Sequence, residues 1–252
     1  MESDLETIFS RQLPVYGVEG QAKLKDATVM IVGCGGLGST CSTILSRSGV
    51  GHLILIDCDE VSISNIHRQF LYTQNDIGKS KSKTAASSPL LCLSDNVPVI
   101  THIDKDTAYQ LIEEHHPNVV MDCTDNFEVR YAVNHACARA SVPMVFGSIT
   151  AGQGQVSVYC DLESDPECPC FSCIHPQVPQ QLPSPPPVVP GICSIVGTLQ
   201  AQQAIAIITG VGDKLVRELL TIDMFKLKMR RFKLREKNVN CSVCGIGQKP
   251  NQ

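Results

Sequence analysis

A run of glycines, Gly33-Cys34-Gly35-Gly36-Leu37-Gly38, stands between an apolar, strand-like segment and a helix-like segment. Glycines at these positions allow a tight turn, a close approach of backbone to phosphate and close packing of helix on strand. N–H groups at the start of the helix attract anions. Asp57 follows 19 residues after Gly38, at the end of a second strand, where its carboxylate can accept hydrogen bonds from ribose hydroxyls. The pattern predicts a nucleotide-binding unit of the Rossmann type.

Charged and polar residues beyond the glycines indicate which chemistry the nucleotide undergoes. Asn65, Arg68 and Gln69 are spaced i, i+3 and i+4, so they share one face if helical. Lys81 follows, and Asp122-Cys123-Thr124-Asp125-Asn126 comes after a later strand. Phosphoryl or nucleotidyl transfer needs cations around phosphate and a carboxylate for Mg²⁺. Hydride transfer needs neither, so an NAD-dependent dehydrogenase is disfavoured.

Four of the 13 cysteines form two Cys-x-x-Cys pairs, Cys170 with Cys173 and Cys241 with Cys244, separated by 67 residues. Two such pairs complete a tetrahedral Cys₄ site, which leaves no open position for catalysis. We therefore expect a structural Zn²⁺ that joins the loop region to the C-terminal segment. The remaining cysteines lie mostly in apolar segments and are expected to be small core residues.

The elements that must position these residues follow the pattern of an α/β protein. Short apolar runs alternate with helix-like segments in the first half, which predicts a mostly parallel sheet with crossover helices. Alternating residues from 155 to 159 predict that antiparallel strands continue the sheet in the second half. We expect strands at 27–32, 52–56, 97–103, 118–121, 143–146 and 155–159, two more within 219–234, and helices at 39–47, 126–140 and 195–209.

Two segments of the second half have unusual composition. The segment from Pro176 to Pro190 contains seven prolines, both ends included, which predicts a stiff exposed loop. The segment from Lys226 to Lys237 contains seven basic residues, both ends included. They form either a solvated strand face or a docking surface for an acidic partner.

Whole-chain composition limits the function classes. The formal net charge of −4 gives no support to nucleic acid as the main partner. The acidic N-terminus does not resemble a secretory signal, and no apolar stretch approaches the roughly 18 to 20 residues that span a bilayer. We expect a soluble, cytoplasmic protein.

From about Ser10 to Gly245, the sequence resembles the ThiF, HesA and MoeB family, the bacterial relatives of ubiquitin-activating enzymes. The nearest pattern is that of the molybdopterin-synthase adenylyltransferases. The resemblance rests on the following motifs: Arg11-Gln12, the glycine run, Asp57-Cys58-Asp59, Ser64-Asn65-Ile66-His67-Arg68-Gln69, Lys81, the segment from Asp122 to Asn126, and the cysteine pairs.

The resemblance implies one ThiF-type adenylation domain over residues 1–252, with a nucleotide-binding half (1–150) and a carrier-binding and zinc half (151–252). It implies a homodimer that uses ATP and Mg²⁺ to adenylate the C-terminal Gly-Gly carboxylate of a ubiquitin-like sulfur carrier, in molybdenum cofactor biosynthesis or related sulfur transfer. Asp57 would hold ribose, and Asp125 would hold Mg²⁺. Arg68, Lys81 and the neighbouring subunit's counterpart of Arg11 would hold phosphates. Asp59, Asn65, Gln69 and Asn126 complete the expected site.

One departure from the family concerns a nucleophilic cysteine that many members carry after the first pair. No cysteine occurs between Cys173 and Cys193, and the expected position falls near Pro183. Cys193 is the nearest substitute, although its apolar neighbours favour a packed side chain. With the sequence ending at Gln252, adenylation alone is expected. The alternatives are an activating enzyme for another ubiquitin-like modifier or a thiamine-pathway carrier, a non-catalytic partner subunit, and a tRNA-modifying relative.

Overall fold

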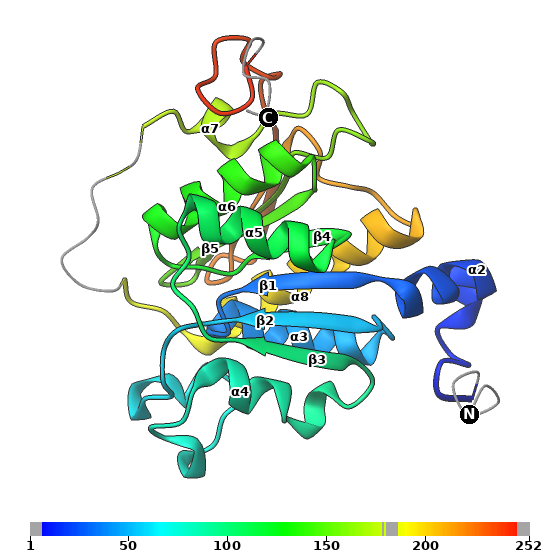
Figure 1. Cartoon of the computed structure of the whole chain (residues 1–252), viewed down its shortest axis with the longest axis vertical. Coiled ribbons are helices and arrows are strands. Elements are labelled where there is room, and N and C mark those ends of the chain that lie inside the picture. Colours follow the sequence, from blue (N-terminus) through cyan, green and yellow to red (C-terminus); the bar gives the residue numbers. More distant parts are fainter. Residues whose placement is uncertain (1–6, 178, 180–185, 246–252) are drawn as a thin grey trace.

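A computed structural model describes residues 7–177, 179 and 186–245, and places an eight-stranded sheet at the centre of the molecule (Figure 1). The strand order is β3-β2-β1-β4-β5-β6-β7-β8. Pairs from β3 to β5 are parallel, and pairs from β5 to β8 are antiparallel. The expected mostly parallel sheet with an antiparallel continuation is confirmed. Its strands are β1 (Thr28–Val32), β2 (His52–Ile56), β3 (Asp95–Val99), β4 (Val119–Asp122), β5 (Met144–Thr150), β6 (Gln153–Tyr159), β7 (Glu218–Asp223) and β8 (Lys228–Lys233).

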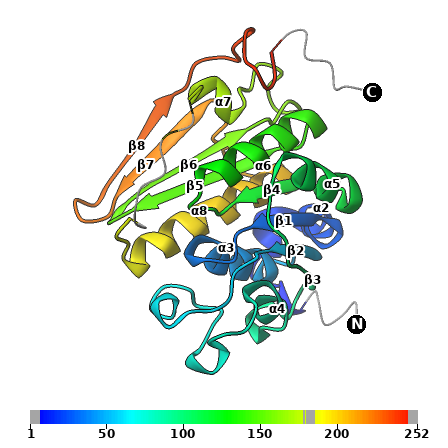
Figure 2. The ribbon, with the colours of Figure 1, turned by 60° about the vertical axis from the view of Figure 1, so that its left-hand side comes forward.

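Helices cover both faces of the sheet, with α3 and α8 on one side and α5 and α6 on the other (Figure 2). Side chains of β1 alternate between the two cores, since Val29 and Ile31 face α3 while Met30 and Val32 face α5 and α6. The helices are α2 (Leu13–Asp26), α3 (Gly36–Arg47), α4 (Lys81–Ala86), α5 (Lys105–His115), α6 (Phe127–Ala140), α7 (Phe171–Ile174) and α8 (Pro190–Thr209), and the 3₁₀ turns are η1 (Ile63–Asn65), η2 (Gln74–Asp76) and η3 (Pro89–Leu91).

Helix α8 starts five residues before the predicted start at 195, because Pro190 stands in its first turn, where a missing N–H costs nothing. The extension makes it 20 residues long with a mean hydropathy of 1.4, enough in length and composition to cross a membrane. The expectation that no such stretch exists was therefore wrong. However, 56% of that apolar stretch is buried inside the protein, as in a core helix.

Strand β3 ends at Val99, whereas we predicted a strand over 97–103. It is the edge strand and contains Pro98, which lacks the N–H needed in a central strand. The chain then leads to Asp104, whose side chain caps α5 by accepting a hydrogen bond from Thr107 N. The apolar residues beyond Val99 therefore belong to the connection into a helix that we did not predict.

The proline-rich segment is only partly among the described residues, since 178 and 180–185, with the Pro183 position, lie outside them. Val188 forms a single parallel bridge with Ala151, next to the turn between β5 and β6. The segment therefore returns to the sheet before α8 begins.

Candidate nucleotide and metal sites

The glycine turn lies where the carboxyl ends of three parallel strands meet. Val32 of β1 is paired with Ile56 of β2 and with Asp122 of β4, so the loops after all three strands leave the sheet at one edge. Gly33 has φ +94°, and a Cβ there would stand 2.8 Å from the carbonyl oxygen of Cys123. The turn therefore needs glycine for its conformation and for its contact with the loop after β4. An edge of this kind is where open α/β sheets bind ligands.

Asp57 directly follows β2 and fixes the turn from one side. Its Oδ2 accepts a hydrogen bond from Cys34 N at 2.8 Å, and its Oδ1 accepts one from Asp59 N at 2.8 Å. Burial raises the pKa of the Asp57 carboxyl, although Lys81 and the two backbone donors oppose the shift. Each oxygen keeps further acceptor capacity, which suits a ribose diol.

Lys81 is the first residue of α4, and only 8% of its side chain is exposed. Its Nζ lies 2.8 Å from Oδ2 of Asp59, whose side chain is 65% exposed. Lys81 N also donates to the Asp59 carbonyl at 3.0 Å. Asp59 thus holds the lysine at the site through both backbone and side chain. A bound phosphate would compete with this carboxylate for the ammonium group.

Asn65, Arg68 and Gln69 form a turn rather than the α-helical face that we considered. The Asn65 carbonyl accepts hydrogen bonds from Arg68 N and Gln69 N, both at 3.0 Å. The Asn65 side-chain oxygen accepts one from Ser62 N at 3.1 Å, so it caps its own turn. Asn65 therefore shapes the segment that presents the other two residues.

Arg68 and Gln69 both reach the glycine turn. Cγ of Arg68 lies 3.7 Å from where a Cβ on Gly36 would stand, and Nε2 of Gln69 lies 3.6 Å from the same point on Gly35. Gln69 is 4% exposed, and its Oε1 has no hydrogen-bond partner among the described residues. A buried polar atom without a partner is costly, so this position fits a polar ligand.

Asp125 and Asn126 follow β4, in the loop that touches Gly33. Asp125 is exposed and available to a cation. Asn126 caps α6, because its Oδ1 accepts hydrogen bonds from Glu128 N at 2.8 Å and Val129 N at 3.3 Å. Asn126, which we predicted to bind the nucleotide, thus also has a structural role, because it starts the helix that follows Asp125.

Arg11 is exposed and lies away from the turn in its own chain. The next residue, Gln12, donates to the carbonyl of Ser48 at 2.8 Å, and Ser48 caps the far end of α3. Since α3 has 12 residues, this end is about 18 Å from Gly36. The chain alone does not bring Arg11 to the site.

Two buried residues that we did not predict hold the carboxyl end of β4. Arg130 of α6 places Nε 2.6 Å from Oδ2 of Asp122. Gln200 of α8 donates to the Asp122 carbonyl at 2.8 Å. Neither has a sequence signal, because an arginine on a predicted helix and a glutamine in an apolar one are read as ordinary surface residues.

Cys193 lies at the glycine turn rather than merely within apolar packing. Its Sγ is 2.9 Å from where a Cβ on Gly36 would stand, and the side chain is buried. Burial raises the pKa of this thiol, and the charge of Arg68 opposes the shift only in part. A buried, protonated thiol is a poor nucleophile.

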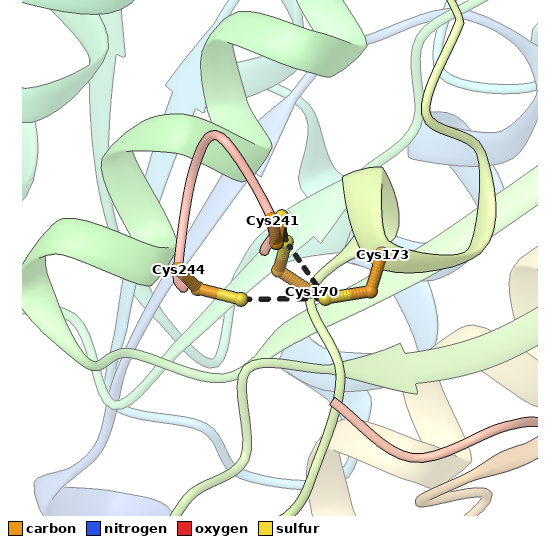
Figure 3. Close-up of side chains that lie close together, drawn as sticks. All are labelled: Cys170, Cys173, Cys241 and Cys244. Carbon is orange, nitrogen blue, oxygen red and sulfur yellow. Dashed lines mark hydrogen bonds between the residues drawn. The ribbon is translucent and has the colours of Figure 1, made fainter. Parts of the chain in front are cut away.

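The two cysteine pairs converge as expected (Figure 3). Sγ of Cys170 lies 3.6 Å from Sγ of Cys241, and Sγ of Cys173 lies 3.4 Å from Sγ of Cys244. All four sulfurs lie within 4.8 Å of one another. Tetrahedral zinc with thiolate ligands requires sulfurs about 3.8 Å apart. The donor set therefore fits a closed structural metal site.

A groove of about 480 Å³ crosses the face of β5–β8 that the helices leave open. Its wall is polar on β6 and β7, with Gln155 and Thr221, and basic towards β8, with Lys226, Lys228 and Arg230. The registers place Gln155, Thr221 and Arg230 in one row across three strands. Basic residues of the predicted run thus gather on one concave surface.

Comparisons with known proteins agree with this architecture. The model of the ThiF family matches residues 9–243. The adenylyltransferase and sulfurtransferase MOCS3 of Caenorhabditis briggsae is 36% identical over 245 residues, which cover 94% of this chain and 60% of that protein. The protein of the same name from Drosophila persimilis is 38% identical over 250 residues, covering 94% and 53%. The chain thus spans little more than half the length of these relatives.

Solved structures show the same fold. Escherichia coli MccB with MccA-N7isoASN superposes with a TM-score of 0.81 at 24% identity, covering 95% of this chain and 74% of that one. MccB with ATP gives a TM-score of 0.79 at 25% identity, covering 94% and 73%.

Proposed function

The chain belongs to the ThiF family, and from that membership we propose that it transfers AMP from ATP to the C-terminal Gly-Gly carboxylate of a ubiquitin-like carrier protein. One observation carries the proposal: the glycine turn, Asp57, Lys81, Arg68 and the loop of Asp125 meet at a single edge of the sheet. The MOCS3 relatives are named adenylyltransferases, and MccB has been solved with ATP, which supports the same reading.

Each side chain has a role in this proposal. The turn and the N-terminus of α3 bind phosphate, and Asp57 accepts hydrogen bonds from the ribose. Arg68 and Lys81 neutralise the triphosphate, and Asp59 holds Lys81 until the nucleotide arrives. The Gln69 amide oxygen has no hydrogen-bond partner among the described residues, and it can accept a hydrogen bond from a ribose hydroxyl. Asp125 would hold Mg²⁺, which supplies positive charge to the phosphate oxygens.

The reaction needs orientation more than acid or base catalysis. A carboxylate is ionised at neutral pH, so the carrier's terminus already is the nucleophile. A carboxylate oxygen forms a bond to the α-phosphorus while the bond from that phosphorus to the bridging oxygen of pyrophosphate breaks. Cationic side chains bring two anions together and stabilise charge that grows on the leaving group.

We also propose that the active form is a homodimer in which Arg11 completes the partner's site. Arg11 adjoins Gln12, which contacts the end of α3 that lies about 18 Å from the glycine turn of the same chain. Nearby on α2, Val15 and Val18 are 62% and 77% exposed. Exposed apolar side chains beside an arginine for which the described residues show no hydrogen bond or ion pair fit a subunit contact.

The carrier belongs to sulfur transfer in this proposal, because the relatives are named sulfurtransferases as well as adenylyltransferases. Molybdenum cofactor biosynthesis is the pathway that we propose. Residues 1–150 would bind the nucleotide, and residues 151–252 would bind the carrier and Zn²⁺. The Cys₄ set is assigned to structural Zn²⁺ because four thiolates leave no open position. The setting would be the cytoplasm, where thiols stay reduced.

The test is exchange of labelled pyrophosphate into ATP, which requires reversible adenylation. Exchange should depend on a carrier ending in Gly-Gly and should vanish when the last glycine is deleted. Asp125→Asn should abolish it while the protein stays folded. A chain that binds carrier but gives no exchange with any such carrier would instead be a non-catalytic partner subunit.

A further inference from the structure

Arg130 joins two parts of the molecule that the sequence gives no reason to connect. Its side chain is 4% exposed, and its partner Asp122 is fully buried. Beyond the 2.6 Å contact between Nε and Oδ2 of Asp122, its Nη2 donates to the carbonyl of Thr124 at 2.6 Å and to that of Gly147 at 3.1 Å. Burying a guanidinium is costly unless its donors are satisfied, and here they bind loop backbone as well as a carboxylate.

These contacts fix the backbone on both sides of Asp125. Thr124 is held by Arg130 through its carbonyl and by Asp122 Oδ1 through its N–H at 3.1 Å and its hydroxyl at 2.6 Å. Asn126 is held as the cap of α6. The exposed carboxylate of Asp125 therefore stands on a segment anchored one residue before it and one residue after it.

The other side of Arg130 faces the aromatic residues next to the Cys₄ site. The guanidinium carbon lies 4.9 Å from the ring centroid of Phe146 and 6.0 Å from that of Phe171. Phe171 stands between Cys170 and Ser172 in the first cysteine pair. Its ring stacks on His175 at 4.5 Å. One end of Arg130 thus contacts the Asp125 segment, and its flank contacts the cysteine segment.

Helix α6 is tied to the cysteine segment by hydrogen bonds as well. Asn134 accepts from Phe171 N at 2.7 Å and donates to Oγ of Ser172 at 2.9 Å. The hydroxyl of Tyr131 lies 2.7 Å from the His175 carbonyl, to which it donates. Since α6 begins at the cap beside Asp125, a shift of the cysteine segment must move or strain this helix.

We propose that Arg130 is a positioning residue through which the Cys₄ site sets the geometry of the Asp125 segment, so that metal occupancy and Mg²⁺–ATP binding are coupled. Zn²⁺ would orient the segment from Cys170 to Cys173. Phe171, together with Phe146, would hold the plane of the Arg130 guanidinium, and Arg130 would place Asp125. Coupling between the affinities of two sites is reciprocal, so Mg²⁺–ATP must raise the affinity for Zn²⁺ by the same factor, and we expect the higher affinity to appear as slower zinc release. This inference rests on the proposed function.

The experiment compares Arg130→Met and Phe171→Leu with Arg139→Met. Arg139 also lies on α6 and stacks on an aromatic ring, Tyr109 at 3.7 Å, which makes it a matched control. ATP affinity is measured by calorimetry with Mg²⁺ and with EDTA. Release of Zn²⁺ to a colorimetric chelator is timed with and without Mg²⁺–ATP, and circular dichroism confirms folding.

In the unmodified protein, Mg²⁺–ATP should slow zinc release about tenfold, within the usual range for coupled sites. Arg130→Met and Phe171→Leu should lose this protection and bind Mg²⁺–ATP about tenfold more weakly, with Mg²⁺-free affinity unchanged. Arg139→Met should behave as unmodified protein. If Arg130→Met does not fold, the same measurements on Phe171→Leu test the proposal.

The coupling would be overturned if Mg²⁺–ATP still slowed zinc release in Phe171→Leu. It would also be overturned if the unmodified protein bound Mg²⁺–ATP but released zinc at the same rate with and without it. Either result would leave the proposed function intact. Failure of the unmodified protein to bind ATP at all would overturn the proposed function and this inference with it.

Discussion

Lys81 keeps its ammonium group 2.8 Å from the carboxylate of Asp59 while its side chain is almost entirely buried. The pair is asymmetric, since the Asp59 side chain is 65% exposed. Loss of the lysine therefore leaves a carboxylate that water can solvate, and the fold should tolerate the change.

Lys81→Met should lower the rate of pyrophosphate exchange by ~100- to 1,000-fold, the usual cost of removing one contact that stabilises developing charge. Methionine preserves the length of the side chain, so the melting temperature should change little. Lys79→Met is the matched control, because the Lys79 side chain is 59% exposed and pairs with Asp76 rather than with Asp59. Equal rates for the two variants would contradict a role of Lys81 with phosphate.

Gly33→Ala should damage both stability and nucleotide binding. The residue has φ +94°, and the new Cβ would stand 2.8 Å from the Cys123 carbonyl oxygen. Gly210→Ala provides the comparison, since Gly210 has φ +75° but no atom of the described part of the chain lies within 4 Å of its Cβ position. Backbone strain of about 1–3 kcal/mol applies to both. In urea unfolding, Gly33→Ala should lose clearly more stability than Gly210→Ala, and only Gly33→Ala should lose ATP affinity.

The sequence alone predicted most strands of the sheet and the clustering of several site residues, because these features depend on short sequence patterns. Apolar runs with glycine turns predicted β1, β2 and α3, and Cys-x-x-Cys spacing predicted the sulfur cluster that the structure assembles. A parallel sheet then brings the carboxyl ends of its strands to one edge without further information.

What the sequence missed depends on contacts between residues far apart in the chain. The role of Arg130 depends on its contacts with Asp122 and Phe171, which only the folded chain brings beside it. The role of Gln200 likewise depends on the packing of α8 against the end of β4. Asn126 was predicted to bind nucleotide, although the structure also gives it the cap of α6. Motif spacing identifies which residues gather at the site, but it does not distinguish residues that bind the nucleotide from residues that stabilise the surrounding backbone.

Acidification should separate the effect of Asp57 on stability from its effect on binding. Burial raises the pKa of this carboxyl above its unfolded value of roughly 3.9, so the folded protein takes up the proton at a higher pH than the unfolded chain does. The contribution of Asp57 to stability is therefore fully present below the unfolded pKa and is lost as the pH rises through the folded pKa.

ATP affinity should change in the opposite direction, because a protonated carboxyl loses acceptor capacity for ribose hydroxyls. Affinity should fall as the pH falls through the raised pKa of Asp57, and Asp57→Asn should bind weakly with no such dependence. Calorimetric titrations from neutral to mildly acidic pH measure this. A parallel decline of both proteins would assign the effect to another group.

Charge on the open groove of β5–β8 should govern carrier binding but not ATP binding. Lys228 and Arg230 line the groove, whereas Lys233 lies at the alternate parity of β8 and faces the other side. Lys228→Glu with Arg230→Glu should raise the carrier KM about tenfold or more, since two charges of a complementary surface are reversed. Lys233→Glu should leave the KM unchanged, and all variants should keep the KM for ATP. If the double variant had an unchanged KM for the carrier, the basic residues would be a solvated strand face and not a docking surface.

Mixing two inactive variants tests whether Arg11 acts across a subunit boundary. Arg11→Ala and Arg68→Ala should each lose exchange activity by ~100-fold or more as homodimers, because every site lacks one phosphate contact. If Arg11 serves the partner subunit, a mixed dimer has one site with both defects and one site with neither.

Refolding equal amounts of the two variants together should therefore restore activity towards a quarter of the unmodified level. Half of the dimers are then mixed, and each mixed dimer has one intact site out of two. If Arg11 served its own chain, each site in the mixed dimer would carry one defect and no activity would return. Restoration is favoured because Gln12, the neighbour of Arg11, contacts the end of α3 that lies about 18 Å from the turn.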